Sequence, residues 1–187
     1  SEVEVYELNE AYNKALIWFF SYPDRGMGLN DLSVQLEVSK TTANRVVKRL
    51  VEEGFLKVEE LGRLWRISCN KDHLFNYSKK VPHNLSMIYG SDLLENILAD
   101  VENARAIILF GSYRKGDDTE DSDIDIAVEV IDDEEPRVTE YRVFPTFGHR
   151  KDVTVNLYLF SRNKIDLNLF ANIANGIVLH GFLEVRP

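Results

Sequence analysis

The sequence predicts an α+β protein made of two small domains. Its 187 residues are enough for one full core or two small ones, since domains usually contain roughly 50–200 residues. The first 70 residues show helical apolar spacing followed by a hairpin pattern, and residues 104–160 contain apolar and alternating runs that are typical of strands. We therefore expect one domain at residues 1–72 and a second, built on a mixed β-sheet flanked by helices, at residues 73–187.

Composition narrows the class of protein. With 44% hydrophobic and 28% charged residues, the chain has the profile of an ordinary globular protein. No apolar run approaches the roughly 18–20 residues of a membrane span, and the start, SEVEVYELNE, is acidic where a secretory signal would be basic. The single cysteine, Cys69, forms neither an intrachain disulfide nor a zinc site by itself. The expected localisation is cytoplasmic, with no membrane partner.

The first two helices are short and end at turn-forming residues. Residues 12–20 have a thick apolar face, which predicts a helix, and SYPDRGMG interrupts it. A second helix follows, with Asn30 or Asp31 as its N-cap, and closes near Val38.

A third helix has one apolar and one polar face. Ser39 is placed to cap it, and Gly54 to end it. Its predicted buried stripe is Ala43, Val46, Val47, Leu50 and Val51. Its predicted outward residues are Lys40, Thr41, Thr42, Asn44, Arg45, Lys48 and Arg49. The segment GFLKVEELGRLWRIS then predicts two strands around Leu61-Gly62.

Residues 9–70 resemble the winged helix-turn-helix family, and VSKTTANRVVKRLVEEGFLKV is similar to its recognition helix. The resemblance implies binding of duplex DNA. The third helix would enter the major groove, and Arg63 and Arg66 of the hairpin would contact the DNA backbone. The net charge is −9, but residues 39–50 contain four basic residues and no acidic residue. The predicted DNA-contacting residues are Ser39, Lys40, Thr41, Thr42, Asn44, Arg45, Lys48, Arg49, Arg63 and Arg66. A module that contacts protein is the alternative.

The segment that joins the two parts lacks a clear period. Residues 70–83 contain Pro82 but also Leu74, Phe75 and Tyr77, so we expect a short packed segment. Residues 84–101 then predict a helix, with Gly90 as an irregularity.

One glycine, one serine and two acidic residues stand out in the second part. ARAIILF, residues 104–110, suits a buried strand, and Gly111-Ser112 follows at its end. Ten residues later Asp123 and Asp125 alternate with apolar residues, so both carboxylates lie on one face of a strand. Paired carboxylates repel unless a cation neutralises them, and oxygen ligands suit Mg²⁺ or Mn²⁺.

The stretch LFGSYRKGDDTEDSDIDIAV resembles the signature of the polymerase-β-like superfamily, in particular its minimal nucleotidyltransferases. The resemblance covers about residues 84–187 and implies that Gly111 and Ser112 hold the triphosphate of an NTP while Asp123 and Asp125 bind metal ions. The family also uses a third carboxylate on a later strand. Asp152 is the best match for this catalytic and metal-binding role, and Glu140 is its competitor.

Other charged residues lie near this signature, and their roles are predicted separately. Arg114 and Lys115 either bind nucleotide phosphates or face solvent. The remaining acids are expected to be a solvated loop or strand end: Asp117, Asp118, Glu120, Asp121, Glu129 and Asp132 to Glu135. The stretch at residues 138–160 predicts a strand pair where minimal nucleotidyltransferases commonly have a helix.

The leading hypothesis is a metal-dependent enzyme that moves NMP from an NTP to an acceptor hydroxyl and also binds DNA. The acceptor is a protein side chain, as in family members that adenylylate partner toxins, or a small molecule. One alternative is a transcriptional regulator whose second domain senses nucleotide or has lost turnover. A third reading is an antitoxin that binds a partner protein; a homodimer is left open.

Overall fold

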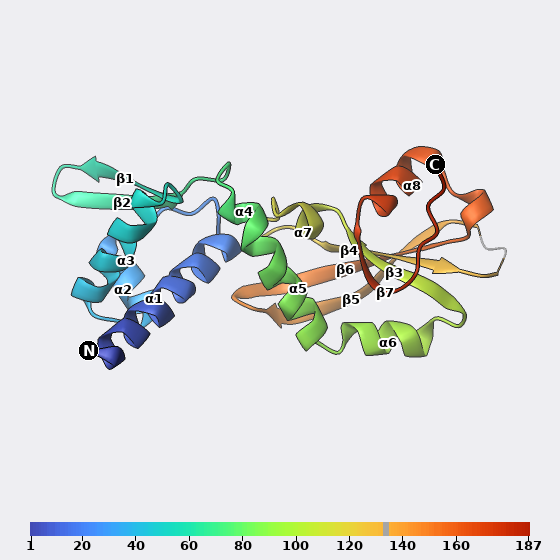
Figure 1. Ribbon diagram of the computed structural model, residues 1–187, viewed down its shortest axis with the longest axis horizontal. Coiled ribbons are helices and arrows are strands. Elements are labelled where there is room, and N and C mark those ends of the chain that lie inside the picture. Colours follow the sequence, from blue (N-terminus) through green and yellow to red (C-terminus); the bar gives the residue numbers. More distant parts are fainter. Residues whose placement is uncertain (133–134) are drawn as a thin grey trace. The chain divides into compact units, whose positions relative to one another are not determined.

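The protein is described by a computed structural model that covers residues 1–132 and 135–187 (Figure 1). The chain divides into two compact units, Ser1–Lys80 and Val81–Pro187. This division falls eight residues beyond the predicted boundary at residue 72, and the joining segment folds largely as helix, in keeping with the short packed segment expected there. Each unit has apolar core clusters of its own.

The first unit consists of three helices, a hairpin and one helical turn. These elements are α1 (Glu2–Ser21), α2 (Leu29–Leu36), α3 (Lys40–Glu52), β1 (Leu56–Leu61), β2 (Leu64–Cys69) and α4 (Phe75–Ser78). Helix α1 begins ten residues earlier than predicted, since Ser1 and Glu4 form a reciprocal capping box. The N-cap of α2 is Gly28, so the prediction of Asn30 or Asp31 was wrong.

The core of the first unit confirms the predicted stripe of α3 with one exception. Ala43, Val46, Val47 and Leu50 are buried, whereas Val51 is 39% exposed. These side chains pack against apolar residues of α1, among them Phe19, and of the hairpin. The outward face of α3 is therefore held in place by a fully buried inner face.

The second unit begins with two helices and continues as a sheet. Its elements are α5 (Lys80–Gly90), α6 (Leu93–Asp100), β3 (Ala104–Phe110), α7 (Ser112–Lys115), β4 (Ile124–Val130), β5 (Arg137–Phe147), β6 (Arg150–Phe160), the 3₁₀ turn η1 (Arg162–Lys164), α8 (Leu167–Ala174) and β7 (Ile177–Gly181). The single helix predicted at residues 84–101 is two helices, because the chain turns after Gly90.

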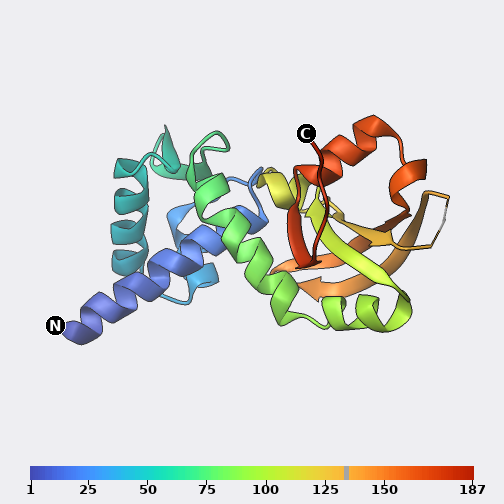
Figure 2. The same cartoon turned by 45° about the vertical axis from the view of Figure 1, so that its right-hand side comes forward.

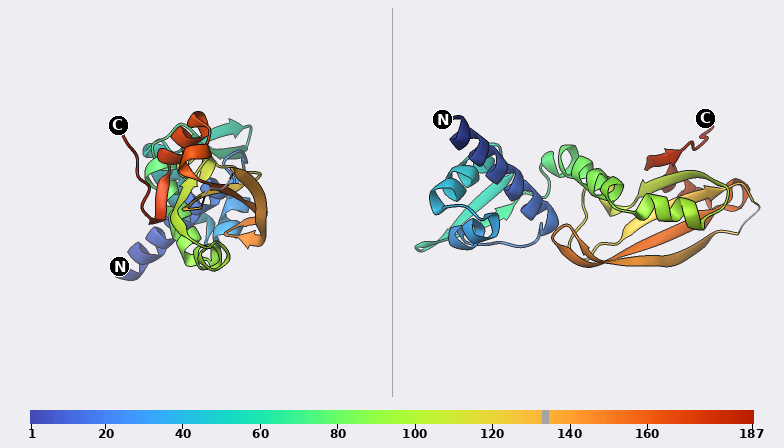
Figure 3. Two further views of the ribbon diagram at one scale, coloured as in Figure 1. Left: turned by 90° about the vertical axis from the view of Figure 1, so that its right-hand side faces the viewer. Right: turned by 90° about the horizontal axis from the view of Figure 1, so that it is seen from below.

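The five strands form one mixed sheet in the order β5-β6-β4-β3-β7. Strands β3 and β4 are antiparallel, and β4 runs parallel to β6. The long β5–β6 hairpin, which Figure 3 shows at the edge of the sheet, turns at Gly148 with a φ of 60° and confirms the predicted strand pair. The fold is α+β, as the sequence predicts.

Helices cover both faces of this sheet. Figure 2 shows α5 and α6 on one side of the strands and α8 on the other. Ile88, Leu93 and Ile97 pack on the first face, and Ile173 of α8 packs on the second. Asp125 and Asn156 belong to the α8 face, because their strand neighbours Ile124 and Val155 point into the opposite core.

No helix among the described residues is long and apolar enough to cross a membrane.

Candidate functional site

The turn after β3 and the first residues of β4 lie side by side. Because the two strands are antiparallel neighbours, Phe110 at the end of β3 pairs with Asp125 near the start of β4. Gly111 and Ser112 therefore follow β3 directly beside Asp123 and Asp125. The structure brings together the two parts of the predicted signature, which are separated by ten residues of sequence.

Gly111 is in contact with the carboxylate of Asp125. Its φ is 77°, a left-handed conformation that favours glycine. A Cβ at this position would lie only 2.5 Å from the Asp125 Oδ2 atom. The absence of a side chain is thus what allows the turn to approach the acidic pair.

An amide on β6 bridges the two carboxylates. Asn156 Nδ2 donates to Asp123 Oδ2 at 3.0 Å and to Asp125 Oδ1 at 3.2 Å. Burial raises the pKa of Asp125, the hydrogen bond from Asn156 lowers it in part, and the charge of Asp123 adds to the increase. The pair is therefore an electrostatically strained site that a cation would relieve.

Asp152 does not lie beside the pair, which corrects the predicted third carboxylate. In the parallel β4–β6 ladder, Asp125 pairs with Asn156, and the ladder begins at Val155. Asp152 is four residues earlier on β6, or roughly 13 Å at about 3.3 Å per residue. Glu140 on β5 pairs with Asn156 from the other side. Among the described residues, no group of three His, Cys, Asp or Glu side chains is arranged to hold a metal ion.

Asn156 and Tyr158 are site residues that the sequence reasoning missed. Tyr158 lies two residues after Asn156 on β6, and its ring contacts Phe110 edge-on at 4.9 Å between centroids. Burial raises the pKa of its phenol, and the charges of Asp125 and Asp123 raise it further. The alternation Asp152, Thr154, Asn156, Tyr158 on one strand face was the available signal.

The two predicted phosphate-binding bases differ in their surroundings. Arg114 Nε donates to the carbonyl oxygen of Asn175 at 3.2 Å, which ties α7 to the end of α8. Lys115 is exposed, and Ser112 is half-buried at the start of α7. Lys115 and Ser112 thus remain available to an anion near the turn, while Arg114 already has a structural contact.

Asp118 is buried, which corrects its assignment to a solvated loop. Arg150 Nη1 lies 2.7 Å from Asp118 Oδ2 and donates to the Tyr113 hydroxyl at 2.8 Å. Asn84 Nδ2 donates to Asp118 Oδ1 at 3.0 Å. This network fixes the middle of the loop that connects Ser112 with Asp123.

Glu129 also departs from the prediction, while most of the other acids follow it. It is 1% exposed and forms ion pairs with Arg105 and Arg162 at 3.8 and 3.4 Å. Glu120 is half-buried, and the exposed acids are Asp117, Asp121, Asp132 and Glu135. Asp133 and Glu134 lie outside the described residues.

In the first unit, α3 lies next to the hairpin (Figure 1), and most of its polar side chains are exposed. Ser39 is the N-cap, and its Oγ accepts from the Thr42 amide at 3.1 Å. The exposed residues of the predicted set are Ser39, Lys40, Thr41, Arg45, Lys48, Arg49, Arg63 and Arg66, while Thr42 and Asn44 are half-buried. The structure therefore places most of this set at the surface.

Arg49 and Arg66 already have intramolecular contacts. The guanidinium of Arg49 lies 4.1 Å over the Tyr12 ring, and its Nε is 3.3 Å from Glu53. The Arg66 side chain packs over Gly26, where a Cβ would come within 2.3 Å of Arg66 Nε. Arg49 therefore joins α3 to α1, in contrast to Arg45 on the polar face.

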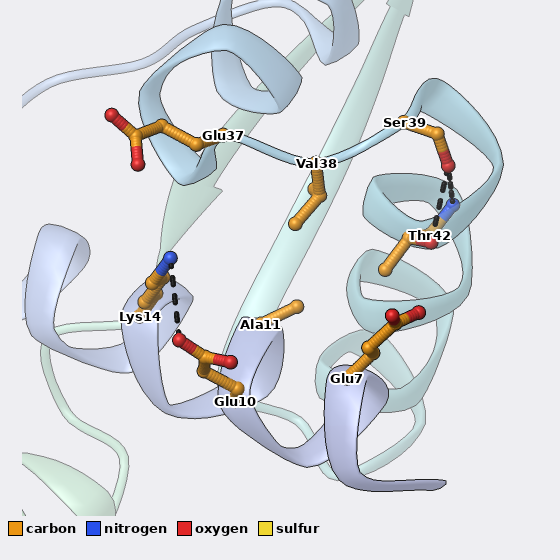
Figure 4. Close-up of a pocket in the computed structure, with 8 residues that line it drawn as sticks. All are labelled: Glu7, Glu10, Ala11, Lys14, Glu37, Val38, Ser39 and Thr42. Atoms are coloured by element: carbon orange, nitrogen blue, oxygen red, sulfur yellow. Dashed lines mark hydrogen bonds and ion pairs between the residues drawn. The ribbon is translucent and has the colours of Figure 1, made fainter. Parts of the chain in front are cut away.

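An acidic pocket borders the N-terminus of α3. Its volume is about 330 Å³, and Figure 4 shows Glu7, Glu10 and Glu37 around it together with Ser39 and Thr42. Lys14 also lines the pocket and pairs with Glu10 at 3.6 Å. These carboxylates limit the surface on which a nucleic acid phosphate would be stable, so the candidate nucleic-acid interface lies toward Arg45, Lys48 and the hairpin.

Fold and site together define a protein that joins a helix-turn-helix domain to a nucleotidyltransferase domain. Residues 93–181 match the family described as "Polymerase beta, Nucleotidyltransferase", and residues 16–60 match the one described as "IclR helix-turn-helix domain". Residues 93–181 therefore carry a polymerase beta nucleotidyltransferase domain, and residues 16–60 carry a helix-turn-helix domain. Both resemblances inferred from the sequence are confirmed.

One relative is a protein of Methanocaldococcus jannaschii named "Putative protein adenylyltransferase". It is 47% identical over 47 residues, which are 25% of this chain and 47% of that protein. The chain thus spans about half the length of this relative.

Proposed function

We propose that the second unit binds a nucleoside triphosphate at the β3–α7 turn and transfers its nucleoside monophosphate to an acceptor hydroxyl. The observation that carries this proposal is the contact between Gly111 and the carboxylate of Asp125, with Asp123 beside it. A turn that begins with a glycine next to an acidic pair can accept phosphates on one side and a cation on the other.

The donor set of the site fits a divalent cation. Asp123 and Asp125 supply carboxylate oxygens, which Mg²⁺ and Mn²⁺ prefer, and the raised pKa of Asp125 reflects burial and repulsion that a cation would offset. When bound, such a cation would neutralise charge on the triphosphate. The predicted third carboxylate plays no part in this proposal.

The roles of the residues follow from their positions. Ser112 offers a hydroxyl donor to a phosphate oxygen, and the exposed Lys115 offers a charge to the outer phosphates. The acceptor oxygen attacks the α-phosphorus, the bond from this phosphorus to the pyrophosphate oxygen breaks, and the acceptor proton passes to solvent. The name of the relative favours ATP as donor and a protein hydroxyl as acceptor.

Incubation with labelled ATP, GTP, CTP or UTP, Mg²⁺ and candidate acceptors tests this proposal. The native protein is expected to label an acceptor, and the Asp123→Ala/Asp125→Ala variant is expected to lose this activity. Asp117→Ala/Asp121→Ala, which removes two exposed acids of the same loop, serves as the matched control. Equal labelling by all three proteins would contradict the assigned site. Nucleotide binding without labelling of any acceptor would favour the alternative of a nucleotide-sensing regulator.

We also propose that the first unit binds duplex DNA. The observation that favours this is the exposed face of α3, where Lys40, Arg45 and Lys48 lie without an acid between residues 39 and 50. Fluorescence anisotropy with a labelled duplex is expected to show binding at low salt that weakens steeply as salt rises. An absence of binding at about 50 mM salt would reject the proposal.

A further inference from the structure

The bridge between the two site carboxylates is an uncharged amide. Both Asp123 and Asp125 accept from the same nitrogen of Asn156, at 3.0 and 3.2 Å. The parallel register between β4 and β6 sets this position, since Asn156 is the partner of Asp125 in the ladder. The side-chain amide of Asn156 therefore lies between the two carboxylates and contacts both of them.

Two divalent cations held at one site share carboxylate ligands, and residue 156 offers an amide in their place. Metal ions that act together in phosphoryl chemistry lie about 3.5–4 Å apart, so their mutual repulsion must be offset by shared carboxylates. Asp123 and Asp125 together carry two negative charges. Among the described residues, no third His, Cys, Asp or Glu joins them in an arrangement that could hold a metal.

The other side chains near the pair do not make up the difference. Tyr158 lies two residues after Asn156 on β6, and its phenol group adds no negative charge at physiological pH. Glu129, on the same strand face as Asp125, is 1% exposed and paired with Arg105 and Arg162. Asp118 is likewise paired, with Arg150.

We propose that Asn156 restricts this site to one divalent cation, held by Asp123 and Asp125 together with the phosphates of the nucleotide. The inference rests on the proposed function of the second unit. To admit the cation, the amide of Asn156 leaves its bridging position or turns its oxygen toward the metal, because an N–H donor and a cation cannot share the same carboxylate lone pairs. Asn156 is thus a positioning residue that determines how many metal ions the site binds.

The test counts Mn²⁺ ions bound by the full chain. The native protein, Asn156→Asp and Asn156→Ala are each saturated with a non-hydrolysable ATP analogue and titrated with Mn²⁺, while electron paramagnetic resonance measures the free ion. The analogue alone is the blank. We expect one ion per protein for the native chain and for Asn156→Ala, which lacks the amide but adds no charge. We expect two ions for Asn156→Asp, whose added carboxylate lies in register with Asp125.

Each other outcome overturns the inference in a distinguishable way. Two ions on the native protein would reject the restriction while leaving the proposed nucleotide and cation site intact. No ion on the native protein would reject the proposed function together with the inference. One ion on a folded Asn156→Asp variant, with folding checked by circular dichroism, would show that residue 156 does not set the number of ions.

Discussion

At the scale of single residues, Gly111 determines how closely the turn approaches Asp125. We expect Gly111→Ala to lower Mn²⁺ affinity at least about tenfold, because its Cβ would displace a carboxylate oxygen 2.5 Å away. The matched control is Gly148→Ala, which also has a positive φ but faces the flexible Met87 side chain at 3.0 Å. Both variants should lose about 1–3 kcal/mol of stability from backbone strain. Titration with Mn²⁺ checks this prediction, and an equal loss of affinity in both variants would contradict it.

The charge of Asp125 should destabilise the cation-free protein. Burial raises its pKa above the ordinary value of 3.8, so the folded state binds this proton more tightly than the unfolded state. The ionised group therefore costs stability at neutral pH, and this cost disappears as pH falls through the folded pKa.

Asp125→Asn should accordingly raise the free energy of unfolding at pH 7 without metal, and the gain should vanish toward the unfolded pKa. The same variant should lose the stabilisation that Mn²⁺ gives the native protein. Urea unfolding at several pH values, with the exposed Asp121→Asn as control, measures both effects. If the stability gained by Asp125→Asn increased as the pH falls, the prediction would be contradicted.

The sequence predicted part of this site from local patterns alone. Gly111 and Asp125 meet because adjacent antiparallel strands place the end of one beside the start of the next. Alternation along β6 predicted Asp152 and Asn156 on one face and left open which of them faces β4, whereas Asp152 has a φ of 54° that interrupts the regular strand. That choice depends on the β4–β6 register, which is set by packing of both strands and not by the residues of either one.

At the scale of elements, the Asp118–Arg150 pair joins the loop before β4 to the start of β6. Both side chains are at most 5% exposed, so removing one leaves a buried charge without its partner. We expect Asp118→Ala to cost about 3–5 kcal/mol of stability. The exposed neighbour Asp117→Ala should change stability by less than about 0.5 kcal/mol. Chemical denaturation of the full chain measures both, and similar values for the two would show that the buried pair is not stabilising.

The burial of Asp118 could not be read from its neighbours. It belongs to a run of acids, and such runs are usually solvated. Its partner Arg150 is 32 residues away, beyond a strand whose position the local sequence does not encode. The helix stripes of the first unit, in contrast, were predicted well because Ala43, Val46 and Leu50 lie within one short helix.

Substitutions of two arginines of α3 should have different effects, one on DNA binding and the other on the stability of the first unit. Arg45 lies on the exposed face, whereas Arg49 packs on Tyr12 and pairs with Glu53. Arg45→Ala should weaken duplex binding and reduce the slope of log affinity against log salt by about one. Arg49→Ala should lower the stability of the first unit and leave this slope unchanged. Anisotropy titrations over a salt series check both slopes, and a reduced slope for Arg49→Ala alone would reverse the assignment.

At the scale of the whole molecule, the two units should respond separately to their ligands. The core of the first unit draws on residues 8–75, and the two clusters of the second draw on residues 85–183. No apolar cluster of the described residues combines residues of both units, so each unit has a core of its own. We therefore expect two calorimetric transitions rather than one.

Mn²⁺ with a non-hydrolysable ATP analogue should raise only the transition of the second unit, since a ligand stabilises the unit that binds it. At about one hundred times the dissociation constant the gain is about 2.7 kcal/mol. Asp118→Ala, which weakens the second unit, identifies its transition, and Asp123→Ala/Asp125→Ala should abolish the shift. Duplex DNA should instead raise the transition of the first unit. A single transition, or equal shifts of both with either ligand, would show that the two units unfold as one cooperative body.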